Sequence, residues 1–153
     1  MPGARVLLRT TLIAGSALRN QVVDGLGAVA GEHRSLIAPA ERPKVGDSLD
    51  LDDASRDEFP QANRWDYLLS VPAHSQIIGL EPHSAKDSEI SVVIAKKQHA
   101  IAYLHAHLPP GRRVAKWFWV SSGRVGFSKM ERARRRLDQS GIAFVDRLLK
   151  SLA

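Results

Sequence analysis

Apolar positions recur with a helical period over residues 84–108. The apolar side chains there are Ile90, Val93, Ile94, Ile101, Leu104 and Leu108. Their spacing of three or four residues places them on one face of an α-helix. Ser84 and Asp87 have the pattern of a capping box at its start, and Pro109-Pro110-Gly111 ends it. This stretch is therefore predicted to be the clearest helix of the chain.

Shorter apolar runs, rich in β-branched and aromatic residues and bounded by turn residues, predict strands. These runs are residues 64–71, 76–83, 113–122 and 142–149. The turn at residues 72–75 joins the first two, which indicates a hairpin. Trp117 and Trp119 share one face of the third run, where core packing is the first interpretation and a platform for stacked bases is the second.

Two further patterns predict helices at residues 16–30 and 128–139. Ser16 can cap the first, and Ser128 with Glu131 has the pattern of a capping box for the second. Strands that alternate with helices indicate an α/β or α+β architecture. We expect three layers, with a mixed central sheet flanked by helices.

The length of 153 residues predicts a single domain, residues 1–153, with a hydrophobic core of its own. Within it, residues 38–62 contain Pro39, Pro43 and Pro60 and a run of acidic residues. We expect a long acidic loop there. Two roles are open for this loop: a cover over a basic groove, or an ordinary solvated segment.

The chain has no cysteine, which excludes disulfides, thiolate zinc sites and cysteine nucleophiles and fits a reducing cytoplasm. Arg9 interrupts the apolar stretch near the N-terminus, so we expect no signal peptide. Uncharged stretches fall well short of the ~20 residues that a membrane span needs. We therefore expect a cytoplasmic protein that does not enter a membrane.

Positive charge gathers in the second part of the chain. Residues 1–60 carry a net charge of −2 and residues 61–153 carry +8. The basic residues expected to contact a partner are Arg112, Arg113, Lys129, Arg132, Arg135 and Arg136. A basic surface of this kind suits nucleic acid, with DNA preferred over RNA, or an acidic protein. A solvated basic surface is the alternative.

Three side chains of the predicted hairpin fall where a single site can collect them. Asp66 lies in its first strand, and Glu81 and His83 lie at the end of its second. Glu81 and His83 share a face because strand side chains repeat every two residues. Two carboxylates that meet on one face suit a hard divalent cation such as Mg²⁺ or Mn²⁺.

Lys97 adds an amine to this group. On a helical wheel it falls within the apolar stripe of the helix at residues 84–108, whereas Lys96 lies about 100° away. A lysine on a core-facing stripe is costly unless its amine reaches water or a carboxylate. We therefore weigh a lysine packed at the helix edge against one that reaches Glu81 or Asp66.

The order of elements and these residues resemble the common core of the PD-(D/E)XK nucleases. That family has an aspartate near the start of one core strand and (D/E)-x-K in the next, positions that match Asp66 and Glu81-Pro82-His83. The resemblance covers roughly residues 16–150 and implies a restriction-endonuclease-like core. It also implies Mg²⁺-dependent hydrolysis of phosphodiesters, with Asp66 and Glu81 on the metal and catalytic roles for His83 and Lys97.

Two residues depart from the family pattern. His83 stands at the lysine position, where it can serve as a base or a metal ligand, or Lys97 can supply the amine instead. Pro82 cannot donate to a sheet ladder. The chain is therefore either a nuclease or a degenerate member that binds nucleic acid without cutting it.

Other functions remain as alternatives. One is a non-enzymatic adaptor in a bacterial defence, mobile-element or toxin-related complex, and another is a hydrolase of unrelated mechanism. His99, His105 and His107 lack the i, i+4 spacing of zinc-binding helices, so we expect them to be solvated. The sequence has no GxSxG elbow and no glycine-rich phosphate loop.

Overall fold

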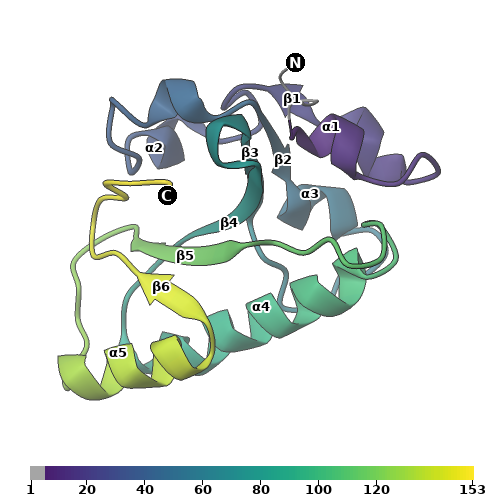
Figure 1. Ribbon diagram of the computed structural model, residues 1–153. Coiled ribbons are helices and arrows are strands. Elements are labelled where there is room, and N and C mark those ends of the chain that lie inside the picture. Colours follow the sequence, from purple (N-terminus) through teal and green to yellow (C-terminus); the bar gives the residue numbers. More distant parts are fainter. Residues whose placement is uncertain (1–5) are drawn as a thin grey trace.

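The computed structural model describes residues 6–153 and contains a mixed α/β fold around a six-stranded sheet (Figure 1). The strands follow the chain order across the sheet. They are β1 (Val23–Asp24), β2 (Asp47–Asp50), β3 (Tyr67–Val71), β4 (Gln76–His83), β5 (Lys116–Ser121) and β6 (Ile142–Phe144). The predicted α/β class with a mixed sheet and helices is confirmed.

The sheet changes from antiparallel to parallel at β4. β1 to β4 pair antiparallel with their neighbours, and β3 and β4 form the expected hairpin around a 3₁₀ turn at Pro72–His74. The parallel pairs β4–β5 and β5–β6 need crossovers. These crossovers are α4 (Ile90–Leu104), preceded by a 3₁₀ turn at Asp87–Glu89, and α5 (Met130–Gln139). Figure 1 shows both helices on the same side of the sheet.

Each face of the sheet has its own apolar core. On the side of α4 and α5, the core includes Trp65, Val93, Trp117 and Trp119. On the other side, Tyr67, Ile78 and Phe118 pack against residues from 26–45 and against the C-terminal Leu149 and Leu152. Short helices complete the structure: α1 (Leu8–Thr11), α2 (Gly31–Arg34) and α3 (Leu51–Ser55), with 3₁₀ turns at Ala17–Gln21 and Arg42–Lys44. The tryptophans at 117 and 119 are core residues, so the base-stacking interpretation is wrong.

The helix expected at residues 16–30 is not formed. Ser16 does act as a cap, accepting the Leu18 N–H at 3.2 Å, but only a 3₁₀ turn follows before β1. Gly25 has φ +55°, a left-handed conformation that ends any regular helix and favours glycine. The two glycines of this stretch therefore break the pattern that the apolar residues suggested.

The long acidic loop expected at residues 38–62 is also wrong, because this segment holds β2 and α3. Asp47 is fully buried, and its carboxylate accepts the backbone N–H of Leu8 at 2.8 Å and the hydroxyl of Ser70 at 2.5 Å. Asp50 caps α3 by accepting the Asp53 N–H at 2.9 Å. Acidic residues that look solvated in the sequence thus satisfy backbone donors inside the fold.

None of the helices formed by residues 6–153 has the length and apolar character needed to cross a bilayer.

Candidate active site

Strand pairing brings Asp66 and Glu81 together. Tyr67 and Leu80 are register partners on β3 and β4, so the residue before Tyr67 lies beside the residue after Leu80. The contact is direct: the backbone N–H of Asp66 donates to Glu81 Oε1 at 2.9 Å. His83 follows on the same face of β4, with its Nδ1 3.4 Å from Glu81 Oε2. The predicted convergence of these three residues is therefore present.

Pro82 fits β4 because one of its neighbours has already ended. β3 pairs with β4 only as far as Leu80, whereas β5 continues alongside to His83. A residue without an N–H is tolerated where a strand has lost a partner. The departure from the family pattern at this position thus costs the sheet little.

Glu81 is the centre of the site. Its side chain is fully buried. One carboxylate oxygen accepts the Asp66 N–H, and the other lies 2.5 Å from Nζ of Lys96. A buried carboxylate is costly unless it is paired and hydrogen-bonded, and both conditions are met here.

The amine of the site belongs to Lys96. Of the two interpretations of Lys97, a catalytic contact with Glu81 or Asp66 is therefore wrong, and packing at the helix edge agrees with the structure. Lys97 Nζ instead donates to the backbone oxygen of Ser140 at 2.5 Å and lies 5.9 Å from the ring centroid of Trp117. The helical wheel misplaced the buried face because it counted Ile101 as a core residue, although the Ile101 side chain is half exposed. The fully buried positions of α4 are centred on Val93, Ala100 and Leu104.

This shift of the buried face has a simple consequence. It turns Lys96 toward the antiparallel half of the sheet, where Asp66 Oδ1 lies 3.7 Å from its amine in addition to Glu81. Lys97 is turned toward α5. Ala100 and Tyr103, both buried, are the sequence signal that could have assigned the two lysines correctly.

The carboxyl of Asp66 carries a strongly shifted pKa. Burial, reinforced by the charge of Glu81 and only partly opposed by Lys96, raises the pKa of Asp66 to about 7. For Lys96, burial alone would lower the pKa, but the charges of Glu81 and Asp66 outweigh it and the pKa is raised. Lys96 is thus held as an ammonium, whereas Asp66 gains and loses its proton near neutral pH.

His83 links the site to a residue that the sequence did not suggest. Its hydrogen bond to Glu81 raises the pKa of His83, since the effect of burial is smaller. Nε2 of the same ring lies 3.5 Å from Glu89 Oε2, at the start of α4. Glu89 has no motif or spacing that marks it, and only the fold brings it beside His83.

Two carboxylate oxygens of the site lie near the same amine. Oδ1 of Asp66 and Oε2 of Glu81 contact the same ammonium, so they are no farther apart than the sum of these two contacts. No cluster of three or more histidine, aspartate or glutamate side chains that could hold a metal occurs within residues 6–153. A metal here would therefore take two carboxylates from the chain and the rest of its ligands from water and substrate.

The six basic residues expected to bind a partner fall into two groups. Lys129, Arg132, Arg135 and Arg136 are exposed, and they begin at the N-terminal end of α5. The burial of Ala133 and Leu137 confirms that the arginines of this helix face outward. Arg112 and Arg113 precede β5 and hence lie at the opposite edge of the sheet (Figure 1).

The α5 group adjoins the acidic site. The backbone N–H of Ser128 donates to both carboxylate oxygens of Asp87 at 3.2 Å, and the guanidinium of Arg136 donates to Ser91 at 3.0 Å. Asp87 lies in the 3₁₀ turn before α4 and Ser91 in the first turn of α4, on either side of Glu89 in the chain. We call Lys129, Arg132, Arg135 and Arg136 the α5 ridge.

The acidic segment around α3 does not cover this ridge. Its carboxylates pair with neighbours in the chain: Asp52 with Arg64 at 2.8 Å and with Arg56 at 2.9 Å. The segment contacts α4 through a hydrogen bond from the Tyr103 hydroxyl to Glu58 at 3.0 Å and through the ring of Phe59, which packs on His99 and Tyr103. The segment therefore packs on the side of α4 away from α5.

The histidines of α4 and the following turn do not converge. His107 Nδ1 lies 2.7 Å from the Ser16 hydroxyl, His105 is exposed, and His99 stacks on Tyr103. His107 and His99 are half buried, so the expectation of solvated side chains holds only for His105.

Comparison with models of known protein families, with curated protein sequences and with solved structures found no significant match.

Proposed function

We propose that the chain is a PD-(D/E)XK-like nuclease that cleaves phosphodiester bonds of nucleic acid with a divalent metal. One observation carries the proposal: Asp66, directly before β3, and Glu81 on the adjacent β4 meet the amine of Lys96 at a single partly buried point. The sheet supports it, since an antiparallel hairpin bears the acids and a helical crossover follows to a parallel strand. The amine comes from the helix, in place of a lysine on the strand.

Asp66 and Glu81 would hold the metal, and Lys96 would move aside from the point between them. A bound Mg²⁺ or Mn²⁺ supplies a Lewis acid that stabilises charge on the phosphate. The raised pKa of Asp66 reflects two carboxylates held close in a largely buried site, a state that a divalent cation would relieve.

Lys96 and His83 then serve the phosphate from opposite sides of Glu81. A displaced Lys96 ammonium can hydrogen-bond a phosphate oxygen as a point charge. The raised pKa of His83 favours its protonated form, which suits proton donation to the leaving oxygen better than the role of base. The Glu89 carboxylate, 3.5 Å from Nε2, also raises the pKa of His83 and so favours the protonated ring.

The α5 ridge would grip the nucleic-acid backbone. Its four cations are exposed. The ridge lies beside the first turn of α4, which directly follows Glu89. Arginine forks match phosphate geometry, and backbone contacts fix the register without reading sequence. The ridge therefore supplies affinity beside the acids that act on the phosphate.

The test is cleavage of plasmid DNA, oligonucleotides and RNA with Mg²⁺ or Mn²⁺. Asp66→Asn, Glu81→Gln and Lys96→Met should each lower the rate by at least about 100-fold. Lys97→Met and Asp138→Asn are the matched controls, since they lie off the site and should cleave as the wild type does. Mn²⁺ binding by calorimetry gives a second readout, which Asp66→Asn should weaken.

Absence of both cleavage and Mn²⁺ binding would reject the nuclease. Cleavage that survives Asp66→Asn and Glu81→Gln would do the same, because it would come from elsewhere.

A second function, binding of nucleic acid without cleavage, is favoured by a specific observation. Both oxygens of Glu81 are already occupied, one by the Asp66 N–H and one by Lys96. Such a closed ion pair is what a degenerate site would keep to stabilise the fold. Retained binding to labelled DNA in a protein that shows neither metal binding nor cleavage would select this function.

A further inference from the structure

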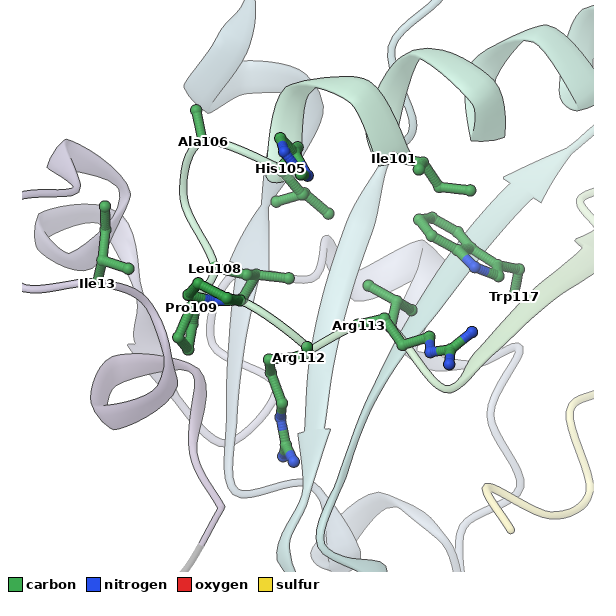
Figure 2. Close-up of a pocket in the computed structure, with 13 residues that line it drawn as sticks. Ile13, Ile101, His105, Ala106, Leu108, Pro109, Arg112, Arg113 and Trp117 are labelled. Carbon is green, nitrogen blue, oxygen red and sulfur yellow. The ribbon is translucent and has the colours of Figure 1, made fainter.

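A pocket of about 560 Å³ lies at the other edge of the sheet from the acidic site. Its walls come from the C-terminal end of α4, the segment at residues 105–115, the start of β5 and Ile13 (Figure 2). Because β4 and β5 run parallel, the start of β5 and the end of β4 are at opposite edges. The volume is in the range of small-molecule sites.

The walls of this pocket expose apolar side chains that a folded protein usually buries. Ile101 is 51% exposed and Ile13 is 38% exposed, although both are large and aliphatic. Figure 2 shows Ile101 pointing toward the ring of Trp117, with Leu108 and Pro109 nearer Ile13. An exposed apolar concavity of this kind marks a binding surface more often than a chance feature.

The floor of the pocket is conformationally fixed. Pro109 and Pro110 restrict their own φ angles, and Gly111 adopts φ +82°, which other residues rarely do. The backbone N–H of Arg112 donates to the Pro109 oxygen at 3.0 Å and closes the turn. A preformed floor lowers the entropic cost of binding a ligand.

The charge at the pocket is of one sign. Arg112, Arg113 and His105 line it, and none of its lining residues is acidic. Arg113 is exposed and takes part in none of the ion pairs among residues 6–153. Arg112 donates to the backbone oxygen of Ser75 at 3.3 Å, while its Nε is buried without an acceptor among those residues. Figure 2 shows the Arg112 side chain pointing away from Ile101 and Trp117, so Arg113 is the cation that this pocket offers to an anion.

We propose that this pocket binds a small molecule with an apolar body and a carboxylate head. The body would lie between Ile101 and Trp117, and the head would meet Arg113. Guanidinium forks match carboxylates in a bidentate manner, which favours this head over a neutral polar group. The site is independent of the proposed nuclease centre, since the two share no residue.

Four probes of known chemistry test the proposal: octanoate, 1-octanol, octylammonium and butyrate. Octanoate should bind at least about tenfold more tightly than each of the other three, because only it carries both an eight-carbon body and the anion. Calorimetry measures the affinity. A shift of the Trp117 indole signal in ¹H–¹⁵N spectra, assigned with Trp117→Phe, places the ligand in the pocket.

Two variants with matched controls complete the experiment. Arg113→Glu and Ile101→Asn should each weaken octanoate at least about tenfold. Arg124→Glu makes the same charge change on an exposed residue beyond the other end of β5, and Val23→Asn replaces a comparably exposed aliphatic residue on β1; both should bind as the wild type does.

Equal affinity for octanoate and 1-octanol would overturn the carboxylate head. An unperturbed Trp117 signal would overturn the site. A third result would also overturn the proposal: the protein does not bind octanoate and forms a dimer that Ile101→Asn dissociates. The apolar face would then be covered by a second copy of the chain.

Discussion

At the scale of single residues, the site is a balance between the buried Glu81 and three ionisable groups around it. Lys96 compensates Glu81 directly and Asp66 at a longer distance, while His83 touches the same carboxylate from the strand. Burial makes each unpaired charge expensive, so the removal of one partner costs more than the pair contributes. The two adjacent lysines of α4 therefore have very different roles.

Lys96→Met should destabilise the protein by about 3–5 kcal/mol, because it leaves the fully buried Glu81 carboxylate without its cation. Lys97→Met should change the free energy of unfolding by less than about 1 kcal/mol, since it removes one bond to a backbone oxygen at a half-buried position. Urea unfolding measures both. The double variant Lys96→Met/Glu81→Gln should recover at least half of the loss. Equal losses for the two lysines would contradict the assignment of Lys96 to the site.

Asp66 gives a prediction about how the stability of the protein depends on pH. Its pKa is about 7 in the folded state, above the usual value of 3.8, so the folded protein holds a proton that the unfolded chain releases. This group therefore makes stability fall as pH rises from about 4 to 7, and the loss persists above 7. Asp66→Asn removes that loss and should stabilise the protein at pH 8 but not at pH 4.

The gain at pH 8 has an upper limit of about 4 kcal/mol if the whole pKa shift is expressed. Solvent reaches the side chain, which is 22% exposed, and lowers the gain below that limit. Urea titrations of both proteins from pH 4 to 9 give the difference curve. His83, whose raised pKa also makes stability fall as pH rises above about 6.5, is present in both proteins and cancels in the difference. A pH-independent difference would contradict the shifted pKa.

At the scale of elements, β4 contributes both to the candidate site and to the packing of the core. Its acidic end carries Glu81 and His83, and its middle residue, Gly79, makes room for two tryptophans. The rings of Trp65 and Trp117 meet edge to face with centroids 4.9 Å apart. A Cβ on Gly79 would lie 2.7 Å from Trp117 and 2.9 Å from Trp65.

Gly79→Ala should destabilise the protein by roughly 1–3 kcal/mol, because both rings are held in the core and must shift to admit the methyl group. Gly123→Ala is the control, since a Cβ there meets no heavy atom within 4 Å. Thermal unfolding measures the difference, and near-ultraviolet dichroism reports the displaced rings. A neutral Gly79→Ala would mean that the tryptophan pair tolerates more space than these contacts allow.

Long segments with a regular apolar pattern were predicted well, and short segments were predicted poorly. The strand at 76–83 matches β4, and α4 and α5 lie within the helices expected at 84–108 and 128–139. The helix expected at residues 16–30 failed because Gly25 adopts a left-handed conformation that ends it, whereas the loop expected at 38–62 failed because its short elements are stabilised by distant partners. Asp47 is an example, since its partners Leu8 and Ser70 are far from it in sequence. Local patterns carry no information on such contacts.

The candidate site was predicted in part for a related reason. Asp66, Glu81 and His83 follow from strand alternation and hairpin pairing, which are local rules. The choice between Lys96 and Lys97 depends on how far α4 is rotated about its axis, which its packing on the sheet sets. Glu89 depends on the path of the chain between β4 and α4, and no periodicity encodes that path.

At the scale of the whole molecule, the two candidate sites lie at opposite edges of the parallel strands. The acidic site and the α5 ridge occupy the edge where β4 ends, and the apolar pocket with Arg112 and Arg113 occupies the other. The net charge of +6 acts over the entire surface and does not distinguish the edges. Contacts with phosphates do distinguish the two edges, because each contact releases counterions and steepens the dependence of affinity on salt.

The salt dependence of DNA binding therefore identifies the edge that binds. With a short duplex, Arg132→Gln/Arg135→Gln should reduce the slope of log affinity against log salt concentration by about 2, one unit for each lost phosphate contact. Arg112→Gln/Arg113→Gln removes the same charge from the other edge and should leave the slope within about 0.5 of the wild type. Fluorescence anisotropy between 50 and about 300 mM salt measures both. If the two double variants lose the same slope, the positive charge binds DNA as a whole, and the α5 ridge has no special place beside the acids.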